Sequence, residues 1–434
     1  MNLAVGLVVL FLAIIIIRIP EFGFVMVLII PLVKNLLIPP DSIFFLNLSF
    51  IFMLVTILSV VLKYSSKIKS IHVEKDHILL FLLFLSVLMF SILYTDSTNY
   101  GLEKLLEFVF FNCFFFIFGI IVFQSCESTK RYLEILKYSI LILSTINAFL
   151  VIKYLFSGST SELIVRFTIT GSNPIGNARV MGLGLILWFY SLVEGKNYSS
   201  RLWCLLALIT ILLSLIATNT RGPFFSVLIV IIIYVLFFSK LSTLKKTSLV
   251  LFVILVISVT FSVLPENLFV RYAYFGEEST FNTTYGLSKS SSSAMRLIYF
   301  RNIFEYFHNF PISIILGTGI GNFSQITPGF DIRRYPHNIF MEILFEQGII
   351  GVGIFLFGLV FLIQKILQFW DEIEVNIKSL FIPFLLSFLY FFLNAQVSGD
   401  ISDNRFVWLL WGGIIGMLSF WESEKNVLSQ MKNA

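Results

Sequence analysis

A histidine, His337, stands at the start of a long apolar run in the sequence Y-P-H-N-I-F-M-E-I-L-F-E-Q-G-I-I-G, which covers residues 335–351. Histidine is the side chain best suited to exchange a proton near neutral pH, so it can serve as a general base. Pro336 disfavours helical geometry in the residue before it, which predicts that a helix begins near His337 or Asn338. The sequence therefore places a proton carrier where a membrane helix meets an aqueous loop. The alternative is a histidine that only satisfies a helix start.

Arg221 is the second candidate, because it lies between two apolar runs in the sequence A-T-N-T-R-G-P. Its guanidinium offers a planar fork of donors that matches the oxygen atoms of a phosphate. The alternative is an interfacial anchor whose charge reaches the lipid head groups. Charges near a membrane core are costly and usually functional, which favours phosphate binding.

Arg296 and Arg301 form a third candidate pair, on one predicted amphipathic helix. One of the two, facing inward, would complete a basic pocket. The alternative is a stripe of charge that faces solvent or the head groups, as is common on such helices. Spacing alone does not choose between Arg296 and Arg301.

Two loops hold the remaining candidates for substrate binding. Arg166 and Arg179 flank F-T-I-T-G-S-N-P-I-G-N-A, a sequence rich in turn residues. Arg333 and Arg334 stand just before the histidine, and Asn338 follows it directly. For Arg179, which begins an apolar run, an interfacial anchor is again the alternative role.

Metal and cofactor chemistry finds little support in the sequence. Asp400 and Asp403 are expected to be structural and to pair with Arg405, and no two carboxylates are arranged to hold a metal. The glycine turn at 317–321 lacks the rest of the dinucleotide-binding fingerprint. The three cysteines are Cys113, Cys126 and Cys204. Their positions indicate neither a disulfide framework nor a metal site, so we predict no metal and no cofactor.

The elements that position these residues are predicted to be membrane helices. Hydrophobic residues make up 58% of the chain and charged residues 13%, with a mean hydropathy of +0.93. Soluble domains are nearer half apolar and a quarter charged. The net charge of +5 is small and scattered, which argues against a nucleic-acid partner. We therefore predict an all-α polytopic protein whose partner is the lipid bilayer.

A membrane-spanning helix needs about 20 apolar residues, and on this basis the chain has about 12 to 14 spans. Residues 3–17 lack a basic leading region and a cleavage site, so we interpret them as a retained helix. The predicted spans are 2–17, 22–38, 43–62, 77–94, 105–123, 132–156, 179–193, 203–217, 222–239, 247–264, 338–364, 379–397 and 405–421.

The orientation of the spans follows from the basic residues, which gather in the loops on the cytoplasmic side. The clusters are Lys63, Lys67, Lys69 and Lys75, then Lys130 and Arg131, Lys196 and Arg201, Lys240, Lys245 and Lys246, Lys365 and Lys378, and Lys425 and Lys432. We predict that these face the cytoplasm. The alternate loops, 95–104, 157–178, 218–221, 265–337 and 398–404, are then external.

The loop 265–337 is far longer than the other connections, and loops beyond about 15 residues are usually functional or disordered. We predict a polar, flexible stretch at 276–293, an amphipathic helix at 294–310 and a glycine turn at 316–323. The whole chain, 1–434, is otherwise interpreted as a single integral membrane domain with this loop inserted between spans.

The histidine block resembles the signature of the O-antigen ligase and polymerase superfamily, in which a His-Asn pair opens a helix ending in E-x-G-x-x-G. The preceding L-G-T-G-I-G-N-F is similar to its glycine-rich turn. S-A-M-R-L-I-Y-F resembles an element with a functional arginine, which selects Arg296 over Arg301. T-N-T-R-G resembles the S-R-G element, with Thr in place of Ser, and selects Arg221. G-S-N-P-I-G-N-A-R is similar to a loop of some relatives and draws attention to Arg179.

The resemblance covers roughly residues 166–352 and implies an inverting, metal-independent glycosyltransferase of the bacterial inner membrane. Its donor would be an oligosaccharide on undecaprenyl diphosphate, used at the external, periplasmic face. His337 would be the catalytic base, and Arg221 and Arg296 would bind the diphosphate. Further candidates for substrate binding are Arg166, Arg179, Arg301, Arg333, Arg334 and Asn338.

Three activities fit this pattern. A polymerase joins the glycan to a sugar hydroxyl of a lipid-linked repeat unit, and we place this first. A ligase joins it to a lipid A core. A polysaccharide flippase or transporter shares the hydropathy, but would be expected to carry charged or broken helices near the bilayer midplane. A chain-length regulator or a flippase is an expected protein partner of a polymerase.

Overall fold

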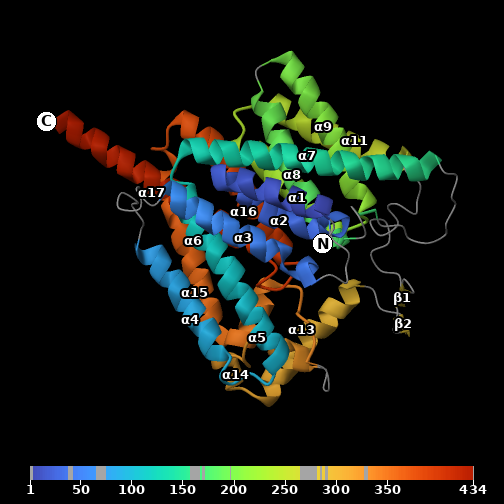
Figure 1. Cartoon of the computed structure of the whole chain (residues 1–434), viewed down its shortest axis with the longest axis vertical. Coiled ribbons are helices and arrows are strands. Elements are labelled where there is room, and N and C mark those ends of the chain that lie inside the picture. Colours follow the sequence, from blue (N-terminus) through green and yellow to red (C-terminus); the bar gives the residue numbers. More distant parts are fainter. Residues whose placement is uncertain are drawn as a thin grey trace. The chain divides into compact units, whose positions relative to one another are not determined.

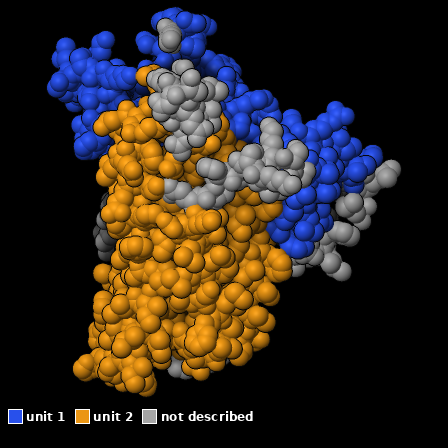
Figure 2. Space-filling model, turned by 90° about the vertical axis from the view of Figure 1, so that its left-hand side faces the viewer, with its two compact units in different colours: residues 1–70, 125–275, 376–390 blue, residues 71–124, 276–375, 391–434 orange. Residues whose placement is uncertain are grey.

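The computed structural model describes residues 3–37, 43–64, 75–156, 167–168, 172–195, 197–263, 281–283, 286–288, 292–326 and 331–433. Helices dominate these residues (Figure 1), which confirms the all-α prediction. The described chain divides into two compact units, shown in two colours in Figure 2. Arg166 and most of the predicted flexible stretch 276–293 lie outside the described residues.

The first unit comprises residues 1–70, 125–275 and 376–390. In it α2 packs on α3 and α7, and α8 packs on α7, α9 and α10. Its helices are α1 (Leu3–Arg18), α2 (Pro20–Leu37), α3 (Ile43–Tyr64), α7 (Cys126–Phe156), α8 (Pro174–Glu194), α9 (Tyr198–Ala217), α10 (Arg221–Ile233), which continues as the π-helix Tyr234–Phe238, and α11 (Thr243–Val263).

The second unit comprises residues 71–124, 276–375 and 391–434. In it α6 packs along α17, and α15 packs on α4, α14 and α17. Its helices are α4 (Lys75–Ser91), α5 (Thr98–Glu107), the π-helix Phe108–Asn112, α6 (Cys113–Val122), α13 (Ser292–Asn309), α14 (Ser313–Leu316), the 3₁₀ helix Asn322–Ile326, α15 (Ile339–Trp370) and α17 (Arg405–Asn433). Helix α16 (Val375–Ala395) contributes residues to both units.

The described part of every predicted span overlaps a helix, and the number of about 12 to 14 spans stays a prediction. Within the described residues, eight helices are long and apolar enough to cross a membrane, and three shorter apolar helices lie at Gly6–Arg18, Pro20–Val33 and Leu48–Tyr64. The exposure of the side chains agrees with this, because many large apolar groups on these helices are exposed, such as Leu62 and Phe357. Exposed leucine and phenylalanine are expected where a surface faces lipid.

The long loop contains more structure than a connection requires. Helix α13 confirms the helix predicted at 294–310, and positive φ angles at Gly317, Gly319 and Gly321 confirm the glycine turn. Two short antiparallel strands, β1 (Phe281–Thr283) and β2 (Gly286–Ser288), pair as a hairpin.

The loops contact one another as the predicted alternation requires. In the second unit, loops predicted to share the external side meet through side-chain hydrogen bonds. Examples are Thr95 to Ile320 O at 2.8 Å, Ser97 to Asp331 at 2.6 Å and Tyr100 to Asp400 at 3.0 Å. Lys425 of the predicted cytoplasmic tail bonds Glu372 of a predicted cytoplasmic loop at 2.8 Å. The alternation of loops is therefore supported within this unit, and the side that each face occupies stays a prediction.

Cysteine labelling tests that side directly. In a protein whose three native cysteines are replaced by serine, His308→Cys should react with a membrane-impermeant thiol reagent from outside the cell. Ser199→Cys should react only after the membrane is opened. Both positions are exposed, so neither result depends on burial. The reverse pattern would refute the orientation.

Candidate active site

His337 is held in a defined backbone geometry directly before α15. Its φ angle is +61°, in the left-handed region. Asn338 caps the helix, because its side-chain oxygen accepts a hydrogen bond from the Met341 N–H at 3.0 Å. The Asn338 amide also donates to the carbonyl of Gln396 at 3.2 Å. The predicted helix start is confirmed, and capping is performed by Asn338 and not by the histidine.

Two tyrosines lie beside the imidazole of His337. The ring of Tyr335 stands edge-on to it, with centroids 4.6 Å apart. The ring of Tyr299, from α13, is roughly parallel to it at 6.4 Å. His337 itself is half-buried. The histidine is thus oriented by its neighbours and still reachable from outside the fold, as a catalytic base must be.

Helix α13 presents Arg296 on the face that carries Tyr299. Residues three and seven positions apart lie on one side of a helix, so Arg296, Tyr299 and Ile303 share a face. Ile303 is fully buried and packs in a cluster with Phe345 of α15. Arg301 lies on another face, with its side chain 79% exposed and bonded to Glu305 at 2.6 Å. This geometry supports the choice of Arg296 over Arg301, which stays a prediction.

Arg333 is engaged by two carboxylates. Its guanidinium lies 2.5 Å from Asp403 and 3.2 Å from Asp400. Burial opposes the charged form of Arg333, but Asp403 and Asp400 outweigh it and raise its pKa. Burial would likewise raise the pKa of Asp400, but Lys104 and Arg333 hold it below its usual value. An incoming diphosphate would therefore meet two negative charges beside Arg333, which argues against that residue as its main ligand.

The predicted partner of these two aspartates was wrong. Among the described contacts, Arg405 lies 4.0 Å from Glu107 and stacks over the ring of Phe111, whereas Arg333 pairs with Asp400 and Asp403. The error arose because Arg405 is close in sequence, while Arg333 reaches the aspartates only through the folded loop.

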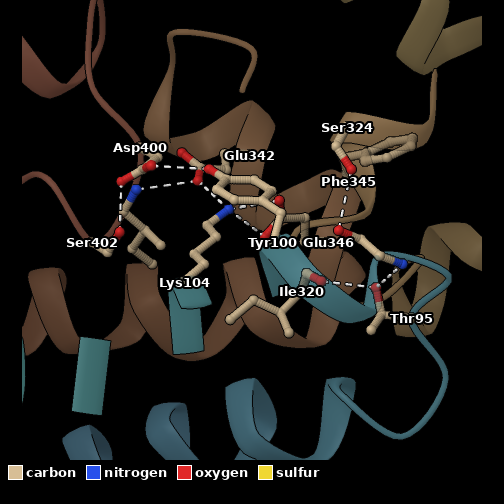
Figure 3. Close-up of polar contacts among 12 residues, drawn as sticks. Thr95, Tyr100, Lys104, Ile320, Ser324, Glu342, Phe345, Glu346, Asp400 and Ser402 are labelled. Atoms are coloured by element: carbon tan, nitrogen blue, oxygen red, sulfur yellow. Dashed lines mark hydrogen bonds and ion pairs between the residues drawn. The ribbon is translucent and has the colours of Figure 1, made fainter. Parts of the chain in front are cut away.

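A buried ion cluster lies next to these residues (Figure 3). Lys104, on α5, is fully buried and its nitrogen lies 2.5 Å from Glu342 and 2.6 Å from Glu346 of α15. Glu342 also accepts a hydrogen bond from the Ile401 N–H at 3.1 Å. Loss of Lys104 alone would leave two buried carboxylates uncompensated, which in proteins costs about 3 to 5 kcal/mol.

The sequence analysis did not identify Lys104 as part of the site. The available signal was a lysine in the loop 95–104, where the orientation predicts almost no basic residue.

Helix α15 is broken at Gly348, whose φ of +66° is not helical. The glycine turn binds the backbone just before this break. The N–H groups of Thr318 and Gly319 donate to the carbonyls of Phe345 and Glu346, each at 2.9 Å. The segment 339–347 is thereby separated from the span 349–370 and secured by the turn.

Arg221 and Arg179 belong to the first unit. Arg221 is the first residue of α10 and is half-buried, as is Arg179 in the second turn of α8. The two helices are neighbours, and a Cβ added at Gly182 of α8 would lie 2.8 Å from Val227 of α10. The two arginines therefore lie near the N-terminal ends of neighbouring helices. That they serve one site with His337 stays a prediction.

Comparison with known proteins bears on this arrangement. Residues 205–356 match the family model described as O-antigen ligase. This stretch is therefore similar to the O-antigen ligase family. It contains Arg221, Arg296 and His337, whereas Arg166, Arg179 and Lys104 lie outside it. No curated protein matches the chain.

The O-antigen ligase match supports membrane-bound glycan transfer of the ligase or polymerase type. The second unit supplies parts that suit such chemistry. An imidazole that can take a proton lies near the helix that bears Arg296, and the residue after it, Asn338, is held by two hydrogen bonds. The candidate site in this unit is thus built from α13, the start of α15 and the loop 398–404.

The glycine turn gives a stability test. Gly317 has φ +78°, and a Cβ there would lie 2.3 Å from the backbone of Glu346. Gly317→Ala should therefore destabilise the protein by about 2 kcal/mol or more, measured by thermal unfolding in detergent. Gly353→Ala is the matched control on α15, because its Cβ would meet nothing within 4 Å. It should be neutral or stabilising by up to about 1 kcal/mol. Equal melting temperatures for the two variants would contradict the assigned role of the turn.

Proposed function

We propose that this protein is an inverting, metal-independent glycosyltransferase at the external face of the bacterial inner membrane. It transfers a glycan from undecaprenyl diphosphate to a sugar hydroxyl of a lipid-linked repeat unit, as a surface polysaccharide polymerase does. The observation that carries the proposal is the setting of His337, which is half-buried, flanked by Tyr299 and Tyr335, and close to the helix that bears Arg296. The family match over the same stretch supports it.

The reaction follows from the chemistry of these groups. His337 accepts the proton of the acceptor hydroxyl as its oxygen attacks the anomeric carbon. The bond from that carbon to the diphosphate oxygen breaks, and the lipid diphosphate leaves with the electron pair. Arg221 and Arg296 stabilise the negative charge that the departing diphosphate gains. Attack on the face opposite the leaving group inverts the anomeric configuration, and no nucleotide is consumed because the donor is already activated.

Ligase activity is the second candidate, because the matching family model carries that description. Polymerase and ligase activities differ only in the acceptor, so the experiment supplies both acceptors. Purified protein in liposomes receives a lipid-linked oligosaccharide donor together with either a second lipid-linked repeat unit or a lipid A core. Polymerase activity gives products lengthened on the lipid-linked repeat unit alone. Product on the lipid A core alone would replace the polymerase proposal with ligation, and no product with either acceptor would refute both.

A further inference from the structure

The segment 339–347 cannot rely on helix continuity for its position. Gly348 interrupts α15 between this segment and the span that follows. His337 precedes the segment directly, so any freedom in 339–347 is freedom in the placement of the imidazole. The glycine turn secures the C-terminal end of the segment, so the part nearer His337 depends on further contacts with the rest of the unit.

Lys104 supplies such contacts, because it forms ion pairs with two glutamates of the segment. Its nitrogen lies 2.5 Å from Glu342 Oε1, and 2.6 and 2.7 Å from the two oxygens of Glu346. The two glutamates lie on successive turns of the segment, and none of the three side chains is more than 1% exposed. In Figure 3 the lysine reaches from α5 toward these carboxylates. One cation thus fixes two turns of the segment to a different helix.

The same cluster extends to the other side of His337. Glu342 accepts from the Ile401 N–H, and the adjacent Asp400 pairs with Arg333, four residues before the histidine. Asp400 is itself held by the Tyr100 hydroxyl at 3.0 Å, one turn before Lys104 on α5. Residues on both sides of His337 are therefore tied to a single turn of α5.

Stability alone does not account for a buried ion cluster of this kind. Apolar residues of similar volume often stabilise a protein as well as a buried ion pair does, or better. Ion pairs and their hydrogen bonds constrain the distance and direction between two side chains, whereas apolar contacts allow the side chains to slide past one another. We propose that Lys104 is a positioning residue, which sets the placement of His337 through Glu342 and Glu346. The proposal rests on the catalytic role of His337 proposed above.

The test replaces the three charged side chains of the cluster with uncharged side chains of similar size. The variant Lys104→Met/Glu342→Gln/Glu346→Gln leaves no uncompensated buried charge, so it should still insert and fold. We expect kcat for transfer to fall about 10²-fold, as misplacement of a catalytic group by about 1 Å does, with donor affinity unchanged. The matched control is Glu21→Gln/Lys63→Met, which neutralises a 3.0 Å ion pair containing a fully buried glutamate in the first unit. The control should keep wild-type kcat.

Hydrogen exchange provides a readout that does not depend on activity. Backbone exchange in the peptide 335–347 should rise in the triple variant and stay unchanged in the control. Unchanged exchange, unchanged kcat, or a loss of donor affinity in place of kcat would each overturn the proposal. If the triple variant does not fold, Glu346→Gln keeps one Lys104–carboxylate pair, and it must show the same rise in exchange and fall in kcat to a smaller degree.

The His337→Asn background separates this proposal from the proposed function. If His337 is the base, adding the triple substitution to His337→Asn should lower the rate no further. If His337→Asn alone retains wild-type transfer, the proposed function fails, and the exchange measurement still reports whether Lys104 positions the segment.

Discussion

His337→Asn is expected to lower the rate of glycan transfer by about 10²- to 10⁴-fold, the usual contribution of a general base. Asparagine tolerates the left-handed backbone that His337 adopts, whereas alanine would add strain there. Asn338 continues to cap α15 in the variant, because the cap does not involve the histidine. The loss therefore reports the chemistry of the imidazole and not the collapse of the helix start. Initial rates with purified protein and a lipid-linked donor measure it.

Donor binding and a second histidine serve as controls for this result. Binding of the lipid-linked donor should be unchanged in His337→Asn, since the arginines are retained. His308→Asn alters an exposed histidine at the end of α13 and should leave the rate unchanged. Near-normal transfer by folded His337→Asn protein would remove His337 from the mechanism.

Arg296→Lys is expected to reduce transfer by about 10²-fold, comparable to removing one preorganised donor from a developing anion. Lysine keeps the positive charge but loses the planar fork that can hold two oxygens of a diphosphate at once. The position of Arg296 on the face of α13 that carries Tyr299 is the reason for expecting this loss. Arg221→Lys should behave alike, because the same chemistry is assigned to it.

Arg301→Lys is the matched comparison on the same helix. The Arg301 side chain is exposed and paired with Glu305, so the rate of glycan transfer by this variant should stay close to that of the wild type. The double variant Arg221→Lys/Arg296→Lys should be the least active of the series. Full activity in the double variant would show that neither guanidinium fork is needed.

Local features of the site could be predicted from the sequence. Pro336 and the apolar run after it located the start of α15, and the three glycines between 317 and 321 located a turn. Such features depend on the backbone preferences of neighbouring residues, which a sequence displays directly. The helical class was equally accessible, because long apolar runs in a sequence predict membrane helices.

Contacts between distant segments were not accessible in this way. Lys104 is separated from Glu346 by 242 positions, and nothing local marks them as partners. Arg333 was interpreted as a candidate for substrate binding, although the fold places it between Asp400 and Asp403. The choice between Arg296 and Arg301 rested on resemblance. The packing of Ile303 and Phe307 in the fold shows which face of α13 is turned inward.

The most direct measurement of the central claim follows the donor and both products in one reaction. Purified protein in liposomes is given a lipid-linked oligosaccharide and a lipid-linked acceptor, and mass spectrometry quantifies the lengthened glycan and free undecaprenyl diphosphate. The account predicts that the two appear in equal amounts with the wild-type protein, and that His337→Asn forms neither at a comparable rate. Movement of the intact donor across the bilayer without either product would contradict it and would indicate a transporter.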